Sequence, residues 1–163
     1  MKTPRRPSAE KRLHRLIGLA VMLSAALPSG ASDIATDIVI SEVLPYPADG
    51  QAAFVELYNP TDQDTNLGGY ALSTDDSRSP RALAGYIPAY GFYLVALAEE
   101  GWPAEWPAPD FVLPELKLAP LTSGLRLFRG EGEEPDMLGW GVAPLYWEGT
   151  PCNTPAAGES LER

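Results

Sequence analysis

Glycine and proline divide this sequence into short segments that cannot continue as long helices. The chain has 15 glycines and 17 prolines among its 163 residues, and no segment beyond residue 31 keeps a helical period through three turns. The segments between these breakers are rich in β-branched and aromatic residues, which is typical of strands. Short strands separated by turn residues predict an all-β fold, an antiparallel β-sandwich. We predict strands at residues 37–44, 52–58, 70–73, 91–98, 124–129 and 136–141, and a short edge strand at 111–113.

The first 31 residues differ in composition from the rest of the chain. Half of the twelve basic residues precede an apolar run at 16–27, and the small residues Ser29 and Ala31 follow it. This order is typical of a secretory signal peptide that is cleaved near Ala31. An uncleaved membrane anchor is the alternative, although the run is shorter than the roughly 20 residues that span a bilayer. We therefore predict a signal peptide at 1–31, one domain at 32–163, and a secreted, periplasmic or cell-surface location. Membrane contact is expected only through an uncleaved leader.

Removal of the leader makes the remaining domain strongly acidic. Lysine and arginine fall from 12 to 6 and aspartate and glutamate from 22 to 21, so the net charge changes from −10 to −15. Such a surface repels the phosphates of nucleic acids and anionic lipid headgroups. We expect no nucleic-acid partner, whereas cationic partners and divalent metals stay open.

The domain also lacks most residues that catalysis commonly uses. The only histidine, His14, lies in the leader, and the domain has a single lysine, Lys117. It also has a single cysteine, Cys152, so an internal disulfide is excluded. Nucleophilic triads and catalytic zinc sites usually need histidine or several cysteines. Glu42 and Glu56 lie on neighbouring predicted strands and leave one route, a carboxylate-dependent hydrolase with this pair as general acid and base. The alternative is a structural role for both side chains, and we predict that the protein is not an enzyme.

A loop after the second predicted strand has oxygen-bearing side chains at alternate positions. Asp62, Asp64 and Asn66 follow the D-x-D-x-N spacing of the first half of a calcium-binding loop. The sixth position of such a loop is usually glycine and the twelfth acidic, whereas this chain has Leu67 and Ser73 there. A polar loop between two strands explains the same residues. We therefore predict no cofactor, and calcium is the one candidate that stays open.

Tryptophans are the candidate ligand-binding residues. Trp102 and Trp106 lie in a proline-rich segment at 101–120, and Trp147 lies near the C-terminus. Indole rings on a stiff loop can stack on sugar rings or anchor a protein interface. The alternative is that the loop folds back and the rings cap one end of the core.

Taken in order, the strand segments resemble the lamin-tail domain. The segment at 39–47 places a glutamate after a β-branched run. The segment at 52–73 has an aromatic–Val–Glu–Leu–Tyr–Asn strand, a polar loop, and a Leu–small–Gly–aromatic–x–Leu strand. Residues that carry the pattern are Ile40, Glu42, Phe54, Glu56, Leu57, Asn59, Leu67, Gly69, Tyr70 and Leu72. Residues 87–95, 123–128, 136–141 and 155–163 are similar to later parts of the family pattern.

The resemblance implies an immunoglobulin-like β-sandwich in which the pattern residues Glu42, Glu56, Asn59 and Gly69 are structural. Besides the nuclear lamins, that family includes exported bacterial proteins in which the domain is a non-catalytic module. The nucleic-acid binding sometimes linked to lamin tails is not expected here, because six scattered basic residues face 21 acidic ones. We predict an exported module that binds a protein or a cell-surface polymer, or that has an adhesive or structural role. The alternative binding hypothesis is a polysaccharide-binding module that uses the tryptophan-bearing loop.

Overall fold

The computed structural model describes residues 35–130 and 132–163. The predicted signal peptide at 1–31 lies outside the described residues, so its cleavage stays a prediction. Within the described ranges, no helix is long and apolar enough to cross a membrane. This part of the chain is β-structure apart from loops and one 3₁₀ turn, η2 (Leu67–Gly69), so the all-β prediction is confirmed.

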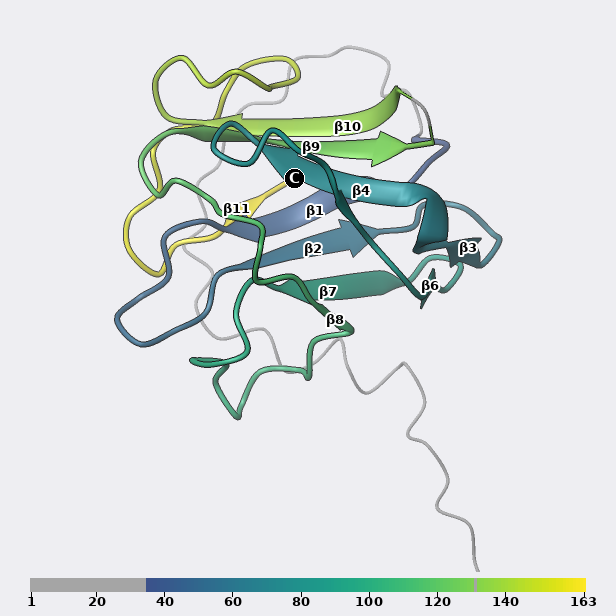
Figure 1. Ribbon diagram of the computed structural model, residues 1–163, viewed down its shortest axis with the longest axis horizontal. Helices are drawn as coiled ribbons and strands as arrows, with labels where there is room; N and C mark the ends of the chain where they lie inside the picture. The colour runs from purple at the N-terminus through teal and green to yellow at the C-terminus, as the bar shows by residue number, and fades with distance from the viewer. Residues whose placement is uncertain (1–34, 131) are drawn as a thin grey trace, which may run out of the picture.

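The strands form two main sheets that pack together as a sandwich (Figure 1). The first sheet has five strands in the order β11-β1-β2-β7-β8, and the second has four in the order β10-β9-β4-β5. A small ribbon pairs β3 with β6. The strand bounds are β1 Val39–Leu44, β2 Phe54–Tyr58, β3 Thr65–Asn66, β4 Tyr70–Thr74, β5 Arg81–Ala82, β6 Tyr86–Ile87, β7 Phe92–Ala96, β8 Phe111–Val112, β9 Ser123–Arg129, β10 Glu133–Trp140 and β11 Leu161–Glu162.

Alternation along the strands decides which face of each sheet is buried. On β2, Val55 and Leu57 are fully buried, whereas Phe54, Glu56 and Tyr58 point to the outer face, as the sequence predicts. Both sheets contribute apolar side chains to one core, and each fully buried leucine or isoleucine contributes about 1.5–3 kcal/mol. The largest fully buried side chains include Trp140, Ile40, Leu57, Leu72, Leu125 and Leu127.

One strand pairing departs from the predicted antiparallel pattern. β8 runs parallel to β7, with Val95 opposite Phe111 and Ala96 opposite Val112. A parallel neighbour needs a long connection, and residues 97–110, which include most of the prolines of the tryptophan-bearing segment, supply it. β8 lies at the edge of its sheet, so the edge strand predicted near 111 is confirmed.

The turn before β10 is shorter than the sequence predicts. The predicted strands at 124–129 and 136–141 leave residues 130–135 as a turn, yet β10 already begins at Glu133. Cross-strand ion pairs explain the difference, because Arg129 pairs with Glu133 at 2.6 Å and Arg126 pairs with Glu134 at 2.7 Å. The prediction also missed β3, β5, β6 and β11, which have two residues each and are too short to show a period.

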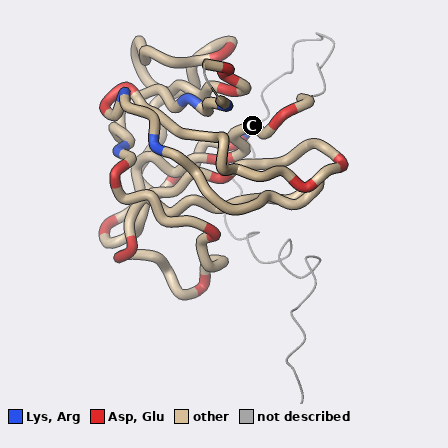
Figure 2. The backbone as a smooth tube through the Cα atoms, turned by 45° about the vertical axis from the view of Figure 1, so that its right-hand side comes forward, with Lys and Arg blue, Asp and Glu red and all other residues tan. Residues whose placement is uncertain are grey.

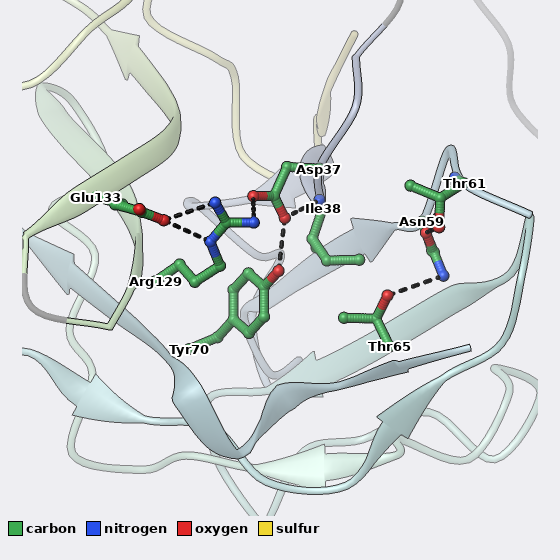
Figure 3. Close-up of polar contacts among 8 residues, drawn as sticks. All are labelled: Asp37, Ile38, Asn59, Thr61, Thr65, Tyr70, Arg129 and Glu133. Atoms are coloured by element: carbon green, nitrogen blue, oxygen red, sulfur yellow. Dashed lines mark hydrogen bonds and ion pairs between the residues drawn. The ribbon is translucent and has the colours of Figure 1, made fainter. Parts of the chain in front are cut away.

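A polar network fixes the segment that enters β1 (Figure 3). The Asp37 carboxylate accepts hydrogen bonds from the Tyr70 hydroxyl at 2.5 Å and from the Ile38 N–H at 2.7 Å, and it forms an ion pair with Arg129. Burial and the neighbouring Asp37 raise the pKa of Tyr70 to about 12. The network joins the start of the five-stranded sheet to β4 and β9 of the other sheet.

A second network fixes the end of the chain. Asp136 on β10 is 3% exposed and accepts hydrogen bonds from the N–H groups of Ile40 at 2.6 Å and Met137 at 2.8 Å. Arg163 forms an ion pair with Asp136, and its own backbone N–H donates to the Ser41 carbonyl at 3.0 Å. The residue after β11 therefore connects the edge of one sheet to a buried carboxylate of the other.

Candidate functional site

A β-bulge on β1 decides which side chains the five-stranded sheet presents to solvent. Ile40 lies opposite Leu57 and Glu42 lies opposite Glu56, so the register shifts at Ser41. In a β-bulge, two residues of one strand oppose a single residue of the other. Ser41 and Glu42 both stay out of the core, while their neighbours along the strand are buried. Glu42 consequently lies on the outer face beside Glu56.

Three carboxylates cross this outer face in a line. Glu162, Glu42 and Glu56, which we call the acidic row, occupy directly paired positions on β11, β1 and β2. Neighbouring strands are about 4.8 Å apart, so these like charges lie close enough to repel one another. Among residues 35–130 and 132–163, none of the three forms an ion pair with lysine or arginine.

Partial burial and repulsion act on the acidic row in the same direction. Burial is the larger cause that raises the pKa of both Glu42 and Glu56, and the charge of Glu162 raises both further. Hydroxyl groups oppose this effect: Ser41 Oγ donates to Glu56 Oε1 at 2.8 Å, and the Ser160 side chain bonds to Glu42. Burial and repulsion therefore disfavour the ionised forms of Glu42 and Glu56, and a bound cation would favour them.

Aromatic rings flank the acidic row along the strands. Tyr58 and Phe92 are paired on β2 and β7 with their ring centroids 4.9 Å apart, and Phe92 is 48% exposed. Phe54 lies on the other side of Glu56 along β2, on the same outer face. The outer face thus alternates aromatic, acidic and aromatic side chains.

The tryptophan-bearing loop folds back onto this same face. Trp102 and Trp106 pack edge to face, with ring centroids 5.2 Å apart, and they contact Phe54 at 6.2 and 5.6 Å. Trp102 Nε1 donates to the Pro107 carbonyl at 2.9 Å. Both indoles are half-buried. They cover an outer-face residue of β2 and not an end of the core.

Trp147 lies on the other sheet. It belongs to residues 142–150, which we call the strap, on the outer face of the four-stranded sheet. Gly124 and Gly139 are paired on β9 and β10, and a Cβ on either would lie less than 3.0 Å from the backbone of Tyr146. Because neither glycine has a side chain, the strap packs directly on the backbone of β9 and β10, beside β10 in Figure 1. The structure brings Trp102 and Trp106 together but leaves Trp147 apart.

The strap also covers an arginine that the sequence analysis did not single out. The Arg126 guanidinium lies over the rings of Phe128 and Tyr146, 4.0 and 4.2 Å from their centroids, and it pairs with Glu134. The only signal for this arrangement is a glycine inside each of two predicted strands, which can mark a close approach of another backbone.

The residues of the calcium motif take part in hydrogen bonds with the loop backbone. Asp64 Oδ1 accepts from the Ala89 N–H at 2.9 Å, and Asn66 Oδ1 accepts from the Gly68 N–H at 2.8 Å, while Asp62 is exposed. In the described part of the chain, no group of three or more His, Cys, Asp or Glu side chains is placed to hold a metal ion. Calcium binding would have to compete with these hydrogen bonds and stays a prediction.

Asn59 organises the loop that follows β2 (Figure 3). Its fully buried side chain accepts, through Oδ1, the N–H and hydroxyl of Thr61 at 3.0 and 2.7 Å. Its Nδ2 lies at 2.7, 3.3 and 3.1 Å from three carbonyl oxygens, those of Gln63, Ile87 and Pro88. Gly69, the other family-pattern residue of this region, makes no close contact that requires glycine. A Cβ added there would meet no other atom within 4 Å.

The paired sheets, the shared core and the edge strands define an immunoglobulin-like β-sandwich. The family model described as Lamin Tail Domain matches residues 32–141, and the chain belongs to this family. The match includes β1 to β10 and ends before the strap and β11. A search of curated proteins gave no match. The lamin-tail domain is generally a non-catalytic domain with a binding or structural role.

Proposed function

We propose that this protein is an exported, non-catalytic lamin-tail domain that binds a partner outside the cytoplasm. Its membership of the family supports the non-catalytic role, and the composition of residues 1–31 supports export. The observation that carries the binding role is the outer face of the five-stranded sheet. Partly exposed aromatic rings there flank three carboxylates that have no ion-pair partner in the described part of the chain. A large contiguous patch of exposed apolar side chains with a polar rim is typical of an interaction surface.

Export is tested by the mass of the protein outside the cytoplasm. When the full chain is expressed, we expect residues 32–163 to be recovered from the periplasmic, surface or medium fraction with Ser32 as the N-terminal residue. The test variant replaces Lys2, Arg5 and Arg6 by Gln, because a signal peptide needs a basic N-terminal region. An intact leader in the membrane fraction would support an anchor, and an intact leader in the cytoplasm would contradict export.

Binding is tested by affinity capture with the tagged protein from envelope and medium fractions. We expect one or more proteins to be enriched over a bait of equal size and net charge. The capture is repeated with and without calcium, so that a metal-dependent partner is not missed. Recovery of the bait alone in every fraction would count heavily against the binding role.

A polysaccharide ligand is the second candidate. Trp106 contacts Phe54 at one end of β2, and the exposed Phe92 pairs with Tyr58 at the other end. The Glu56 carboxylate lies between Phe54 and Tyr58 on the same face. Aromatic faces stack on sugar rings, and carboxylates accept hydrogen bonds from sugar hydroxyls. Retention of the protein on insoluble polysaccharides would favour this candidate.

A further inference from the structure

The outer face of the five-stranded sheet has a charge that nothing else in the described chain balances. The arginines at 126, 129 and 163 pair with other carboxylates, those of Glu134, Asp37, Glu133, Asp136 and Glu148. Two members of the acidic row have serine side chains as partners, Ser41 for Glu56 and Ser160 for Glu42. The other basic residues of the described ranges, Arg78, Arg81 and Lys117, form no ion pair with the row either. Within residues 35–130 and 132–163 the row thus has no cationic partner, and a basic group of another molecule can take that place.

The neighbouring rings fit a guanidinium or ammonium group. Tyr58 lies one outward-facing position along β2 from Glu56, a distance of about 6.8 Å, and Phe92 lies directly beside Tyr58 on β7. A basic side chain can bridge that distance, with its charged end at a carboxylate and its stem or guanidinium plane against a ring. The same domain already holds one arginine in this way: Arg126 pairs with Glu134 and lies over two aromatic rings.

The dimensions of the row fit an extended peptide. The row spans three strands, or about 10 Å, and an extended chain presents a side chain on one face about every 6.8 Å. Two basic residues at alternate positions, about 6.8 Å apart, therefore fit within its length. A second copy of this chain is a poor occupant, because Figure 2 shows aspartate and glutamate on most sides of the domain and few basic residues.

Resting on the proposed binding function, we propose that the outer face of the five-stranded sheet docks an extended arginine- or lysine-rich segment of a partner protein. Glu162, Glu42 and Glu56 pair with its basic side chains, and Tyr58 and Phe92 contact their stems or guanidinium planes. The negative field of the whole domain accelerates association with such a segment.

The test uses a short labelled peptide of alternating arginine and glycine, titrated into the full chain and followed by fluorescence anisotropy. The matched peptide carries citrulline, which has the shape of arginine without its charge. The test variant is Glu42→Gln/Glu56→Gln/Glu162→Gln, and Phe92→Ala probes the ring. The control variant is Asp76→Asn/Glu99→Gln/Glu115→Gln, which removes the same charge from exposed residues without ion-pair partners in the described ranges.

We expect the test variant to weaken arginine-peptide binding by about tenfold or more and the control variant by about twofold at most. Phe92→Ala should weaken binding as well, and the citrulline peptide should bind poorly. Equal losses in the test and control variants, or equal binding of both peptides, would overturn the proposed surface. Retention of the protein on an insoluble polysaccharide together with no peptide binding would also overturn it.

Affinity capture with the same variants separates this proposal from the binding function on which it rests. If the wild type and the test variant capture the same partner equally, the docking surface is wrong and the binding function stands. If the wild type captures nothing and binds no peptide, both are wrong. Loss of a basic partner from the test variant alone supports both.

Discussion

Glu42 and Glu56 lie directly opposite each other on neighbouring strands, and the pKa of each carboxyl group is raised. The bulge at Ser41 produces this relationship, because without it the residue opposite Glu56 would change. The pair shares an outer sheet face with Glu162 and lies between aromatic rings. These two family-pattern residues thus form the centre of the proposed binding surface.

The first prediction concerns the stability of this pair. Glu56→Gln keeps an acceptor for the Ser41 hydroxyl and removes one of the opposed charges. We expect the free energy of unfolding near pH 7 to rise by about 0.2–1 kcal/mol. Urea denaturation measures the change, and a less stable variant near pH 7 would contradict the expected repulsion.

The pH dependence gives a second readout of the same substitution. Because the pKa of Glu56 is higher in the folded state, the folded protein binds more protons than the unfolded chain between the two pKa values. The wild type therefore gains stability as pH falls through the raised pKa toward the ordinary value of 4.5. Glu56→Gln should show a smaller gain, and Glu99→Gln, at an exposed site, is the control.

The second prediction concerns the buried carboxylate on β10. Arg163→Gln leaves Asp136 without its ion-pair partner, and removal of one partner from a fully buried pair costs about 3–5 kcal/mol. The Arg163 side chain is 39% exposed, so we expect a smaller loss, about 1–3 kcal/mol near pH 7. Burial already raises the pKa of Asp136, and loss of the arginine should raise it further, so the loss should shrink as pH falls.

A double-mutant cycle isolates this ion pair. In an Asp136→Asn background the uncompensated charge is absent, so Arg163→Gln should cost clearly less than in the wild type. Equal costs in both backgrounds would mean that the Arg163 side chain acts through its other ion pair, with Glu148, and not through the Asp136 carboxylate.

Much of the sandwich could be predicted because its long strands carry their own pattern. On β2 the buried and outward-facing positions alternate and can be predicted from the five residues at 54–58 alone. The parallel pairing of β8 could not be predicted in this way, because two residues show no period. Its direction depends on the path of the long connection that precedes it.

The candidate surface was only half visible in the sequence for a related reason. The sequence predicts that Glu42 and Glu56 lie on neighbouring strands. Glu162 joins them through β11, which is distant in sequence and pairs over only two residues. The packing of the strap on the sheet depends on contacts between Tyr146 and two glycines, one on β9 and one on β10. Such long-range contacts leave no periodic signal, and only the glycines inside predicted strands point to them.

The third prediction concerns this strap. Gly124→Ala places a Cβ less than 3.0 Å from the Tyr146 backbone, so the strap or β9 has to shift. We expect a loss of about 1–3 kcal/mol and a change in the fluorescence of Trp147, which is 44% exposed. Gly69→Ala is the matched control, because its Cβ would meet nothing within 4 Å. A comparable loss in both variants would point to glycine's backbone freedom and not to the strap as the cause.

The last prediction separates a packing role of the tryptophan loop from a sugar-binding role. Trp106 contacts Phe54 and Trp102 through its ring, but it is only half-buried. We expect Trp106→Ala to lower the free energy of unfolding by about 1–2 kcal/mol, less than the 3–5 kcal/mol typical of a fully buried tryptophan. Trp147→Ala is the control and should change stability little, because the ring is exposed and lies on the other sheet. Unfolding followed by circular dichroism measures both. If Trp106→Ala keeps wild-type stability but loses retention on an insoluble polysaccharide, the ring serves sugar binding, and the second candidate function replaces the first.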